Sequence, residues 1–380
     1  MHEHKHNQCR RKVKHRKNVM KLIIFCITVG ISLMFIYYQN LRKEIDARQK
    51  WLETVLAGEK KWILENQGPE GEFYMNGSKA GDVNPYFACM AALGLLAETK
   101  NCLITETEKK AVNRYLDWHT GILLETDGKM GIYRKESGKF IYKEKADSED
   151  GYLGMYLFLM GKYLEKTEST DLSEYWKKGI SLALKKIQSL MQDGITQVSG
   201  ENTTVYLMDN LEVWKGLYEL ELAGLEDMPA VSEMRKKLQV QIEKLFWDDA
   251  NQRWRIIENS DLYHQKEFYP DGVAQIYPLI YEFPVKEKKK QKILYEQFTE
   301  RFQWQKLNKK RNGFLWAMTG MAAAQMGDIN NLLEMIRNYE AEYCENRKYP
   351  LYTGEAGWIC MECEKLYSLY ERKIKTGFLV

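Results

Sequence analysis

Three carboxylates stand together where an apolar segment of the chain begins. Asp147, Glu149 and Asp150 lead into GYLGMYLFLMGKYL, residues 151–164, a stretch typical of a helix that is buried on all sides. A helix start needs only one capping carboxylate, because a single side chain satisfies its free backbone N–H groups. The surplus favours acid/base chemistry, in which one carboxyl donates a proton and another carboxylate activates water or attacks directly.

Other apolar segments also begin with acids, amides and aromatic residues. The further residues of this kind are Asp82, Asn84 and Tyr86 near 85–97, Tyr152 near 151–164, Asp209, Asn210 and Glu212 in 205–223, Asp271 and Gln275 near 272–283, Trp316 in 313–326, and Glu355 and Trp358 near 357–370. Aromatic faces stack on sugar rings, and crowded acids acquire different pKa values, as glycoside hydrolysis requires. We expect the catalytic acid and base among these carboxylates, and substrate contacts from the other residues.

The elements that must position these residues are helices of two kinds in strict alternation. Six are amphipathic and charged, at 49–67, 108–123, 173–191, 232–246, 286–302 and 330–343. Six are apolar nearly all round, at 85–97, 151–164, 205–223, 272–283, 313–326 and 357–370. Because all-apolar helices are buried, the pattern predicts an all-α (α/α)6 toroid, with six inner and six outer helices. An incomplete toroid and an α-solenoid are the alternatives.

The connections predict which end of the toroid carries the site. Links from a charged helix to the next apolar one are long and rich in Gly, Asn and Asp, such as 68–84 and 248–271, whereas the reverse links are mostly short, such as 326–329. The long loops therefore gather on one face, at the N-termini of the inner helices. Loops on a rigid scaffold commonly hold functional residues.

The N-terminal region has a different composition from the rest. Residues 1–21 carry a charge of +7, and residues 22–380 carry −4, so the folded part gives no reason to expect a nucleic-acid partner. Residues 22–38 are apolar and uncharged, which predicts a transmembrane signal anchor with the basic tail in the cytoplasm. Residues 39–48 then form a juxtamembrane linker, and 49–375 form the extracytoplasmic domain. A cleaved signal peptide is the alternative.

Other chemistries have few candidate residues. His119 and His264 are the only histidines after residue 40, which disfavours a histidine metal site or a Ser/His triad, and no Gly-rich phosphate loop is visible. We therefore expect no metal and no organic cofactor. Cys360 and Cys363 form a C-x-x-C pattern inside an apolar helical stretch, so they are interpreted as core cysteines one helical turn apart.

Over about residues 50–375 the sequence resembles the six-hairpin glycosidase superfamily, and most closely a bacterial group of six-hairpin proteins. The segments that carry the resemblance are NPYFACMAALGLL, DSEDGYLGMYLFL, YLMDNLEVWKGL, FYPDGVAQIYPLI, FLWAMTGMAAAQMGD and YTGEAGW. They occur in the same order and at similar intervals as in that group. The resemblance implies the (α/α)6 fold and a carbohydrate substrate.

Weaker resemblances imply roles for individual acids. Compared with family-8 glycoside hydrolases, Asp82 takes the place of the general acid, which is a Glu in those enzymes, Asp150 matches an Asp that contacts the reacting sugar, and Asp271 matches the base. Compared with glucoamylase-like enzymes, Glu355 takes the place of the base. The two resemblances name different bases, and the proton donor is open among Asp82, Asp147, Glu149 and Asp150.

The sequence thus predicts a membrane-anchored glycoside hydrolase that acts on a cell-surface or secreted polysaccharide, with polysaccharide biosynthesis or export machinery as a potential partner. A catalytically silent toroid that binds glycans during polysaccharide assembly is one alternative. A polysaccharide lyase or epimerase is another, although a lyase favours a basic cleft for its polyanionic substrate, and the residues named above are mostly acidic.

Overall fold

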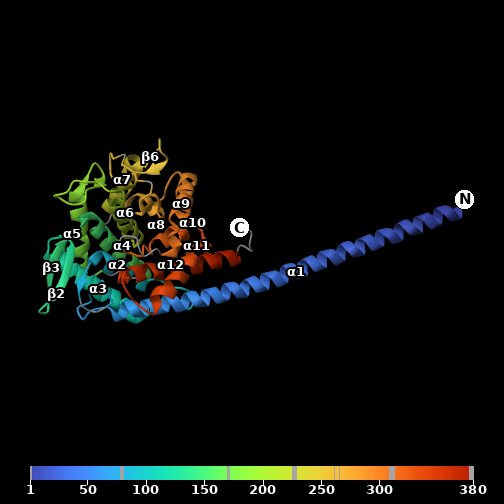
Figure 1. Cartoon of the computed structure of the whole chain (residues 1–380), viewed down its shortest axis with the longest axis horizontal. Coiled ribbons are helices and arrows are strands. Elements are labelled where there is room, and N and C mark those ends of the chain that lie inside the picture. Colours follow the sequence, from blue (N-terminus) through green and yellow to red (C-terminus); the bar gives the residue numbers. More distant parts are fainter. Residues whose placement is uncertain are drawn as a thin grey trace. The chain divides into compact units, whose positions relative to one another are not determined.

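Twelve α-helices make up most of the residues that the structure describes (Figure 1). A computed structural model describes residues 2–77, 81–168, 172–224, 229–260, 262–264, 266–307 and 313–375. The helices are α1 (His2–Glu65), α2 (Pro85–Leu95), α3 (Glu106–Glu125), α4 (Glu149–Thr167), α5 (Glu174–Leu190), α6 (Leu207–Leu222), α7 (Pro229–Phe246), α8 (Val273–Ile280), α9 (Lys288–Phe302), α10 (Thr319–Met326), α11 (Ile329–Tyr339) and α12 (Thr353–Lys375).

The even-numbered helices form a closed inner ring. Neighbours pack in the order α2, α4, α6, α8 and α10. Gly320 of α10 lies against Glu362 of α12, and Gly357 of α12 lies against the backbone of Met90 in α2, so the ring closes. These helices are buried on nearly every side, as their apolar sequences predict. The (α/α)6 toroid expected from the sequence is confirmed.

The outer helices cover this ring, and each packs against an inner helix beside it in the chain; α3, α5, α7, α9 and α11 pack in this way. Buried polar contacts join the ends of the outer layer. Glu59, fully buried in the last turns of α1, accepts hydrogen bonds from Tyr339 Oη (2.8 Å) and Arg347 Nη1 (2.5 Å). Because a buried carboxylate is costly unless it is paired, these contacts fix the first outer helix to the last.

Glycines allow α4 and α6 to approach closely. A Cβ atom on Gly154 would lie 2.7 Å from the backbone nitrogen of Val213 and 2.8 Å from the carbonyl carbon of Glu212. Gly216 faces the same contact from α6, where a Cβ would lie 2.3 Å from the Gly154 carbonyl oxygen. The backbone that carries Glu212 is therefore held directly against α4.

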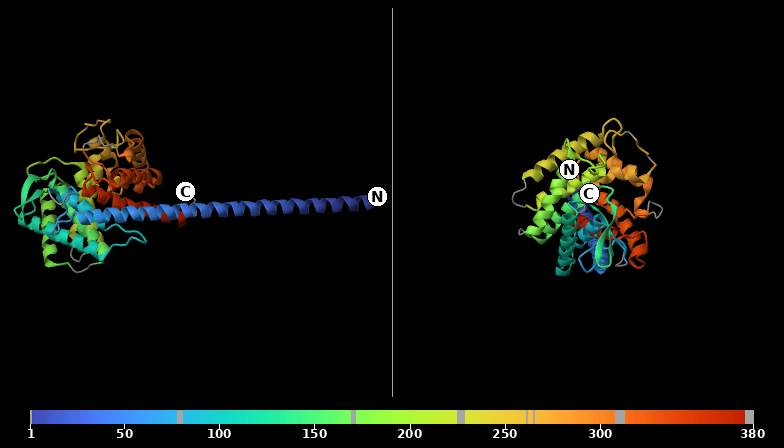
Figure 2. Two further views of the ribbon diagram at one scale, coloured as in Figure 1. Left: turned by 60° about the horizontal axis from the view of Figure 1, so that its bottom comes forward. Right: turned by 90° about the vertical axis from the view of Figure 1, so that its left-hand side faces the viewer.

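Short strands occupy the long loops, and sequence analysis missed them. The largest sheet has the order β1 (Asp82–Val83), β2 (Gly131–Glu136), β3 (Lys139–Lys145), and the β2–β3 hairpin lies at the left of Figure 1. Two smaller antiparallel pairs are β4 (Met191–Gln192) with β5 (Ile195–Thr196) and β6 (Trp247–Asp248) with β7 (Arg253–Trp254). Figure 2 gives two further views of these elements. The strands stiffen loops that a helical pattern cannot specify.

The predicted helix ranges agree with the structure to within a few residues at most ends, although α12 spans Thr353–Lys375 where 357–370 is predicted. Two further places differ. Residues 313–326 were expected to be one inner helix, but α10 begins only at Thr319, because Trp316 adopts a left-handed backbone conformation with φ = 57°. Residues 39–48, expected as a linker, continue α1 as helix. The α1 segment that starts at Ile23 is, among the described residues, the one helix long and apolar enough to cross a membrane, and a signal sequence has the same features.

Candidate functional site

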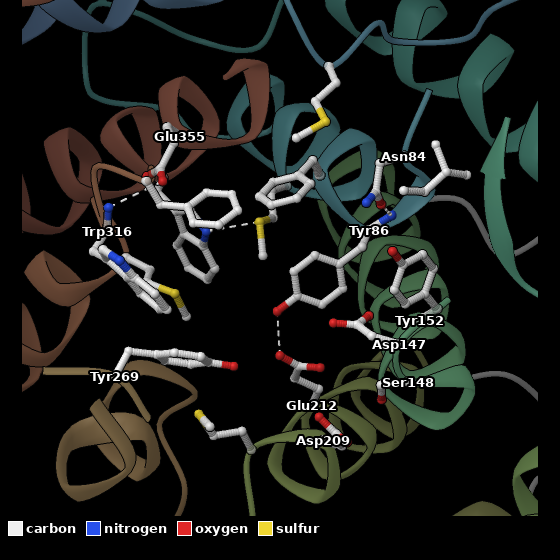
Figure 3. A pocket seen from close by; sticks show the side chains of 18 of the residues that line it. Asn84, Tyr86, Asp147, Ser148, Tyr152, Asp209, Glu212, Tyr269, Trp316 and Glu355 are labelled. Atoms are coloured by element: carbon white, nitrogen blue, oxygen red, sulfur yellow. Dashed lines mark hydrogen bonds between the residues drawn. The ribbon is translucent and has the colours of Figure 1, made fainter. Parts of the chain in front are cut away.

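A cavity of about 510 Å³ lies where the inner helices begin (Figure 3). This volume is within the range of about 300–1,000 Å³ typical of small-molecule sites. The start of every inner helix contributes to its wall, through Asn84 for α2, Ser148 for α4, Asp209 for α6, Tyr269 for α8, Trp316 for α10 and Glu355 for α12. Helix N-termini carry partial positive charge, so six of them favour the carboxylates that line this space.

Glu212 presents one carboxyl oxygen to this cavity while the other is held by tyrosines. Its Oε1 accepts hydrogen bonds from Tyr86 Oη, from Tyr277 Oη (2.5 Å) and from Tyr281 Oη (3.3 Å). No donor from the described residues reaches Oε2. The side chain is only 3% exposed, and Figure 3 shows it pointing toward the interior of the cavity. One oxygen therefore fixes the carboxyl group, and the other, which lies beside Gly151 of α4, has no donor among the described residues.

The surroundings of Glu212 favour its protonated form. Burial raises the pKa of Glu212 to about 7, and the charges of Asp150 and Asp147 also raise it, whereas the phenol hydrogen bonds lower it. Burial raises the pKa of Asp209 well above its usual range, with the charges of Asp150 and Glu212 acting in the same direction. A crowded group of acids near neutral pH thus retains at least one proton.

Glu355 is held differently, through both of its oxygens. Oε1 accepts the backbone N–H of Trp316 at 3.2 Å, and Oε2 accepts that of Ala317 at 2.9 Å. Burial raises the pKa of Glu355 to about 7, and these N–H groups lower it. Backbone donors stabilise a carboxylate in its ionised form. Because α12 and α6 are the sixth and third of six inner helices, Glu355 and Glu212 reach the cavity from different walls (Figure 3).

The carboxylate of Asp147 faces the cavity without a partner among the described residues. It lines the cavity and is exposed, and it makes no hydrogen bond or ion pair with any described residue. Of the four acids expected to include the proton donor, it alone is among the residues that line this space. Figure 3 shows it beside Tyr86 and Glu212.

Aromatic side chains cover much of the remaining wall. Trp316 and Tyr269 lie with ring centroids 4.7 Å apart, and Tyr86 and Tyr152 lie 5.4 Å apart. Trp358 also lines the cavity. The left-handed backbone of Trp316 is unfavourable for a large side chain, and such strain is concentrated at functional sites. The predicted contact residues Asn84, Tyr86, Asp147, Tyr152, Asp209, Glu212, Trp316 and Trp358 all line the cavity, as does Glu355.

Asp271 and Gln275 are placed elsewhere. Neither is among the residues described as lining the cavity. Asp271 is 2% exposed and accepts the backbone N–H of His264 at 2.6 Å. The Gln275 side chain bonds to the backbone N–H and carbonyl of Trp254. Both side chains therefore hold the long loop before α8 against that helix. Polar residues at a helix start often have such a structural role.

Asp150 and Asn210 belong to a buried network behind the cavity wall. Asp150 accepts hydrogen bonds from Ser148 Oγ (2.8 Å) and Thr196 Oγ1 (2.6 Å), and Thr196 also bonds to Asn210. Burial raises the pKa of Asp150 to about 6. The helix cap of α4 is Ser148, which accepts from Gly151 N–H. The acids at the start of α4 therefore have different surroundings. Asp150 bonds to Thr196 behind the cavity wall, whereas Asp147 faces the cavity.

Asp82 and Glu149 make ion pairs outside the described cavity lining. Asp82 lies in β1 and pairs with Arg134 of β2 through two bonds of 2.6 and 2.9 Å. Glu149 lies 3.7 Å from Lys145 Nζ. Neither side chain is among the cavity-lining residues that the structure describes. Both oxygens of the Asp82 carboxylate therefore accept hydrogen bonds from an arginine outside the cavity lining.

The structure adds lining residues that the sequence pattern did not indicate. Ile132, Glu144 and Lys145 come from the β2–β3 hairpin, Tyr277 from the middle of α8, and Phe314 from the segment before α10. Only the alternation of apolar and polar residues in 131–145 could have revealed the hairpin. Lys145 brings a cation to the lining, and its ammonium group pairs with Glu201 at 2.9 Å.

Metal ligation has no support among the described residues, where no group of three or more His, Cys, Asp and Glu side chains is arranged to hold an ion. His119 is fully buried, and burial lowers its pKa to about 3. It packs among the rings of Tyr115, Trp118 and Tyr156. The sequence-based expectation of carboxylate chemistry without a cofactor remains a prediction.

Solved structures with a similar fold include two glycosidases and a sugar isomerase. A wild-type glycosidase superposes with a TM-score of 0.61 at 12% identity, over 85% of this chain and 98% of that chain. An inactive variant of an α-1,6-mannanase from Salegentibacter sp., in complex with α-1,6-mannotetrose, gives a TM-score of 0.55 at 9% identity, over 84% and 99% of the two chains. A D-mannose isomerase gives 0.55 at 12%, over 84% and 97%.

These likenesses show the fold. No protein-family model matches the sequence, and no curated protein matches it. The resemblance to six-hairpin glycosidases is confirmed at the level of architecture, because such neighbours superpose over 84–85% of this chain and 98–99% of their own.

Proposed function

We propose that the protein is a membrane-anchored glycoside hydrolase, in which Glu212 is the proton donor and Glu355 is the catalytic base. The observation that carries this proposal is the pairing of two buried glutamates from different walls of one aromatic-lined cavity, where burial raises the pKa of each to about 7. Neighbouring acids favour the proton on Glu212, and backbone N–H groups favour the anion on Glu355.

The chemistry follows from these two environments. Glu212 donates its proton to the glycosidic oxygen from Oε2, while Oε1 remains held by Tyr277 and Tyr86. Glu355 removes a proton from the attacking water, or attacks the anomeric carbon itself, as charge develops on the sugar. Tyr269 and Trp316 hold the ring by stacking. The carboxylate of Asp147, which lines the cavity and is exposed, stabilises the positive charge that forms in the oxocarbenium-like transition state.

The polymeric substrate is inferred from the open cavity and from the fold neighbours, one of which holds an oligosaccharide. The apolar segment of α1 and the preceding basic residues support an anchor with the domain outside the cytoplasm. A cell-surface or secreted polysaccharide fits that location. A polyanionic substrate, such as a lyase requires, fits poorly because Asp147, Asp209, Glu212 and Glu355 all face the cavity.

The test is the release of new reducing ends from a panel of purified polysaccharides by the full chain in detergent or vesicles. The panel comprises α-1,6-mannan, β-glucans, chitosan and bacterial exopolysaccharides. The matched control is the double variant Glu212→Gln/Glu355→Gln, which preserves the size of both side chains. Release by the wild type and none by the double variant supports the proposal. Retention of polysaccharide on the wild type without any cleavage establishes the silent glycan-binding toroid instead.

A further inference from the structure

A row of aromatic side chains leads from the cavity to the surface. Phe87 and Phe314 line the cavity and are stacked, with centroids 5.6 Å apart and 14° between the ring planes. Tyr352 contacts both, at 5.8 Å from Phe87 and 5.5 Å from Phe314. Tyr349 follows at 6.1 Å from Tyr352. These four residues are termed the aromatic row.

The outer end of the row is open to solvent yet held in place. Tyr349 is 70% exposed, an unusual state for a large aromatic side chain that continues a buried cluster. Its hydroxyl group lies over Gly313, where a Cβ atom would be only 2.4 Å away, and Gly313 has φ = 74°. Gly313 directly precedes Phe314, so the Tyr349 ring rests on the same segment that brings Phe314 and Trp316 to the cavity.

We propose that the aromatic row is an extended binding surface for the same glycan, on which sugar units beyond those in the cavity stack on Tyr352 and Tyr349. This inference rests on the proposed function. Successive ring centroids of the row lie 5.5 to 6.1 Å apart, and Phe87 and Phe314 connect the row to the cavity. The ring planes of Tyr349 and Tyr352 are at 82° to each other, so a glycan that stacks on both turns between them. Aromatic faces bind the C–H face of a sugar, and tyrosine hydroxyls bond to its rim. No carboxylate belongs to the row, so it contributes affinity and not bond cleavage.

The consequence is a dependence on chain length. A short oligosaccharide fills only the cavity, and a longer one also reaches the row. The variant Tyr349→Ala should therefore lower kcat/KM about three- to tenfold for long oligosaccharides and leave the value for a disaccharide or trisaccharide unchanged, since one stacked aromatic contact is worth roughly 1 kcal/mol. The matched control is Tyr175→Ala, which removes an exposed tyrosine of α5.

The experiment uses size-fractionated ladders of α-1,6-mannan, chitosan and β-1,4-glucan oligosaccharides, with kcat/KM and retention in affinity electrophoresis both measured for the full chain. The loss for long chains alone supports the row, and an equal loss for all lengths, or none, overturns it. If no ladder is cleaved but Tyr349→Ala weakens retention of long chains only, the row is correct and the hydrolase proposal fails. If the wild type retains no ladder, the row is also overturned.

Discussion

Glu355 is bound by the backbone of Trp316, which among the described residues of the cavity wall is the one with a left-handed conformation. The Trp316 N–H donates to Glu355 Oε1 at 3.2 Å, and the φ of Trp316 is 57°. The same turn that directs this N–H toward the carboxylate also places the indole beside Tyr269. A strained backbone thus positions a charged group and a stacking surface together, which accounts for the late start of α10.

The identity of the base is tested by comparing Glu355→Gln with Asp271→Asn. Both changes replace a buried carboxylate by an amide of nearly the same size. We expect Glu355→Gln to reduce kcat by roughly 10²–10⁴ because the base is lost. We expect Asp271→Asn to retain turnover, because its carbonyl oxygen still accepts the His264 N–H outside the cavity. Melting temperatures measured in parallel should differ little from the wild type, and loss of turnover in Asp271→Asn with an unchanged melt would reassign the base.

The pH dependence of hydrolysis reports on Glu212. A proton donor must be protonated, so activity should fall as pH rises through the pKa of Glu212, about 7. The base must be ionised, so activity should fall as pH decreases through the pKa of Glu355, also about 7. We expect a bell-shaped profile near neutral pH. Glu212→Gln should lack the alkaline limb and retain activity only on aryl glycosides whose leaving group needs no proton. An alkaline limb that persists in this variant would assign the donor to another group, with Asp147 the next candidate.

The same protonation shifts predict how stability depends on pH. Glu212 and Glu355 have folded-state pKa values of about 7, above their ordinary value of 4.5, so the folded protein binds these protons more tightly. Their contribution to the free energy of unfolding is fully present below about pH 4.5 and is lost as pH rises to about 7. Glu355→Gln should remove its part of this slope. Urea unfolding of the wild type and the variant across this range measures the difference, and parallel curves would contradict the assignment.

The contact between α4 and α6 is tested by Gly154→Ala. The added Cβ would lie within 2.8 Å of the Glu212 backbone, so we expect a loss of roughly 1–3 kcal/mol in unfolding free energy together with reduced activity. The matched control is Gly58→Ala in α1, where nothing lies within 4 Å of the new Cβ. There the higher helix propensity of alanine should stabilise the protein by up to about 1 kcal/mol. Chemical denaturation of both variants distinguishes crowding from propensity.

Membrane topology is tested with fusions to the C-terminus. The basic residues before the apolar segment predict that the helical domain lies outside the cytoplasm. An alkaline phosphatase fused there should be active in cells, and a cytoplasmic reporter at the same position should not be. The opposite pair of results would place the domain in the cytoplasm. Release of the phosphatase into the medium would instead indicate a cleaved signal peptide.

The sequence by itself determined the architecture, because the distribution of apolar residues around each helix indicates whether that helix is buried on all sides or on one. GYLGMYLFLMGKYL is apolar on every side and can only be an inner helix, whereas SEYWKKGISLALKKIQSLM, residues 173–191, has one charged face and must be an outer one. Six alternations then leave few packings other than a closed toroid. The same pattern brought Glu355, Glu212 and Asp147 to the starts of inner helices, and therefore to one face.

Only the tertiary structure decided which of these acids face the cavity. Asp147 and Asp150 are three residues apart, yet one faces the cavity and the other bonds to Thr196 behind the wall. Likewise, Asp271 accepts a hydrogen bond from His264 in the loop before α8, and Asp82 accepts one from Arg134. Arg134 lies in a β-hairpin that the helical pattern of the sequence does not reveal. The role of each carboxylate depends on which hydrogen-bond donor from a distant segment lies beside it in the folded chain. Periodicity specifies the face of a helix, but long-range partners specify what each polar side chain on that face does.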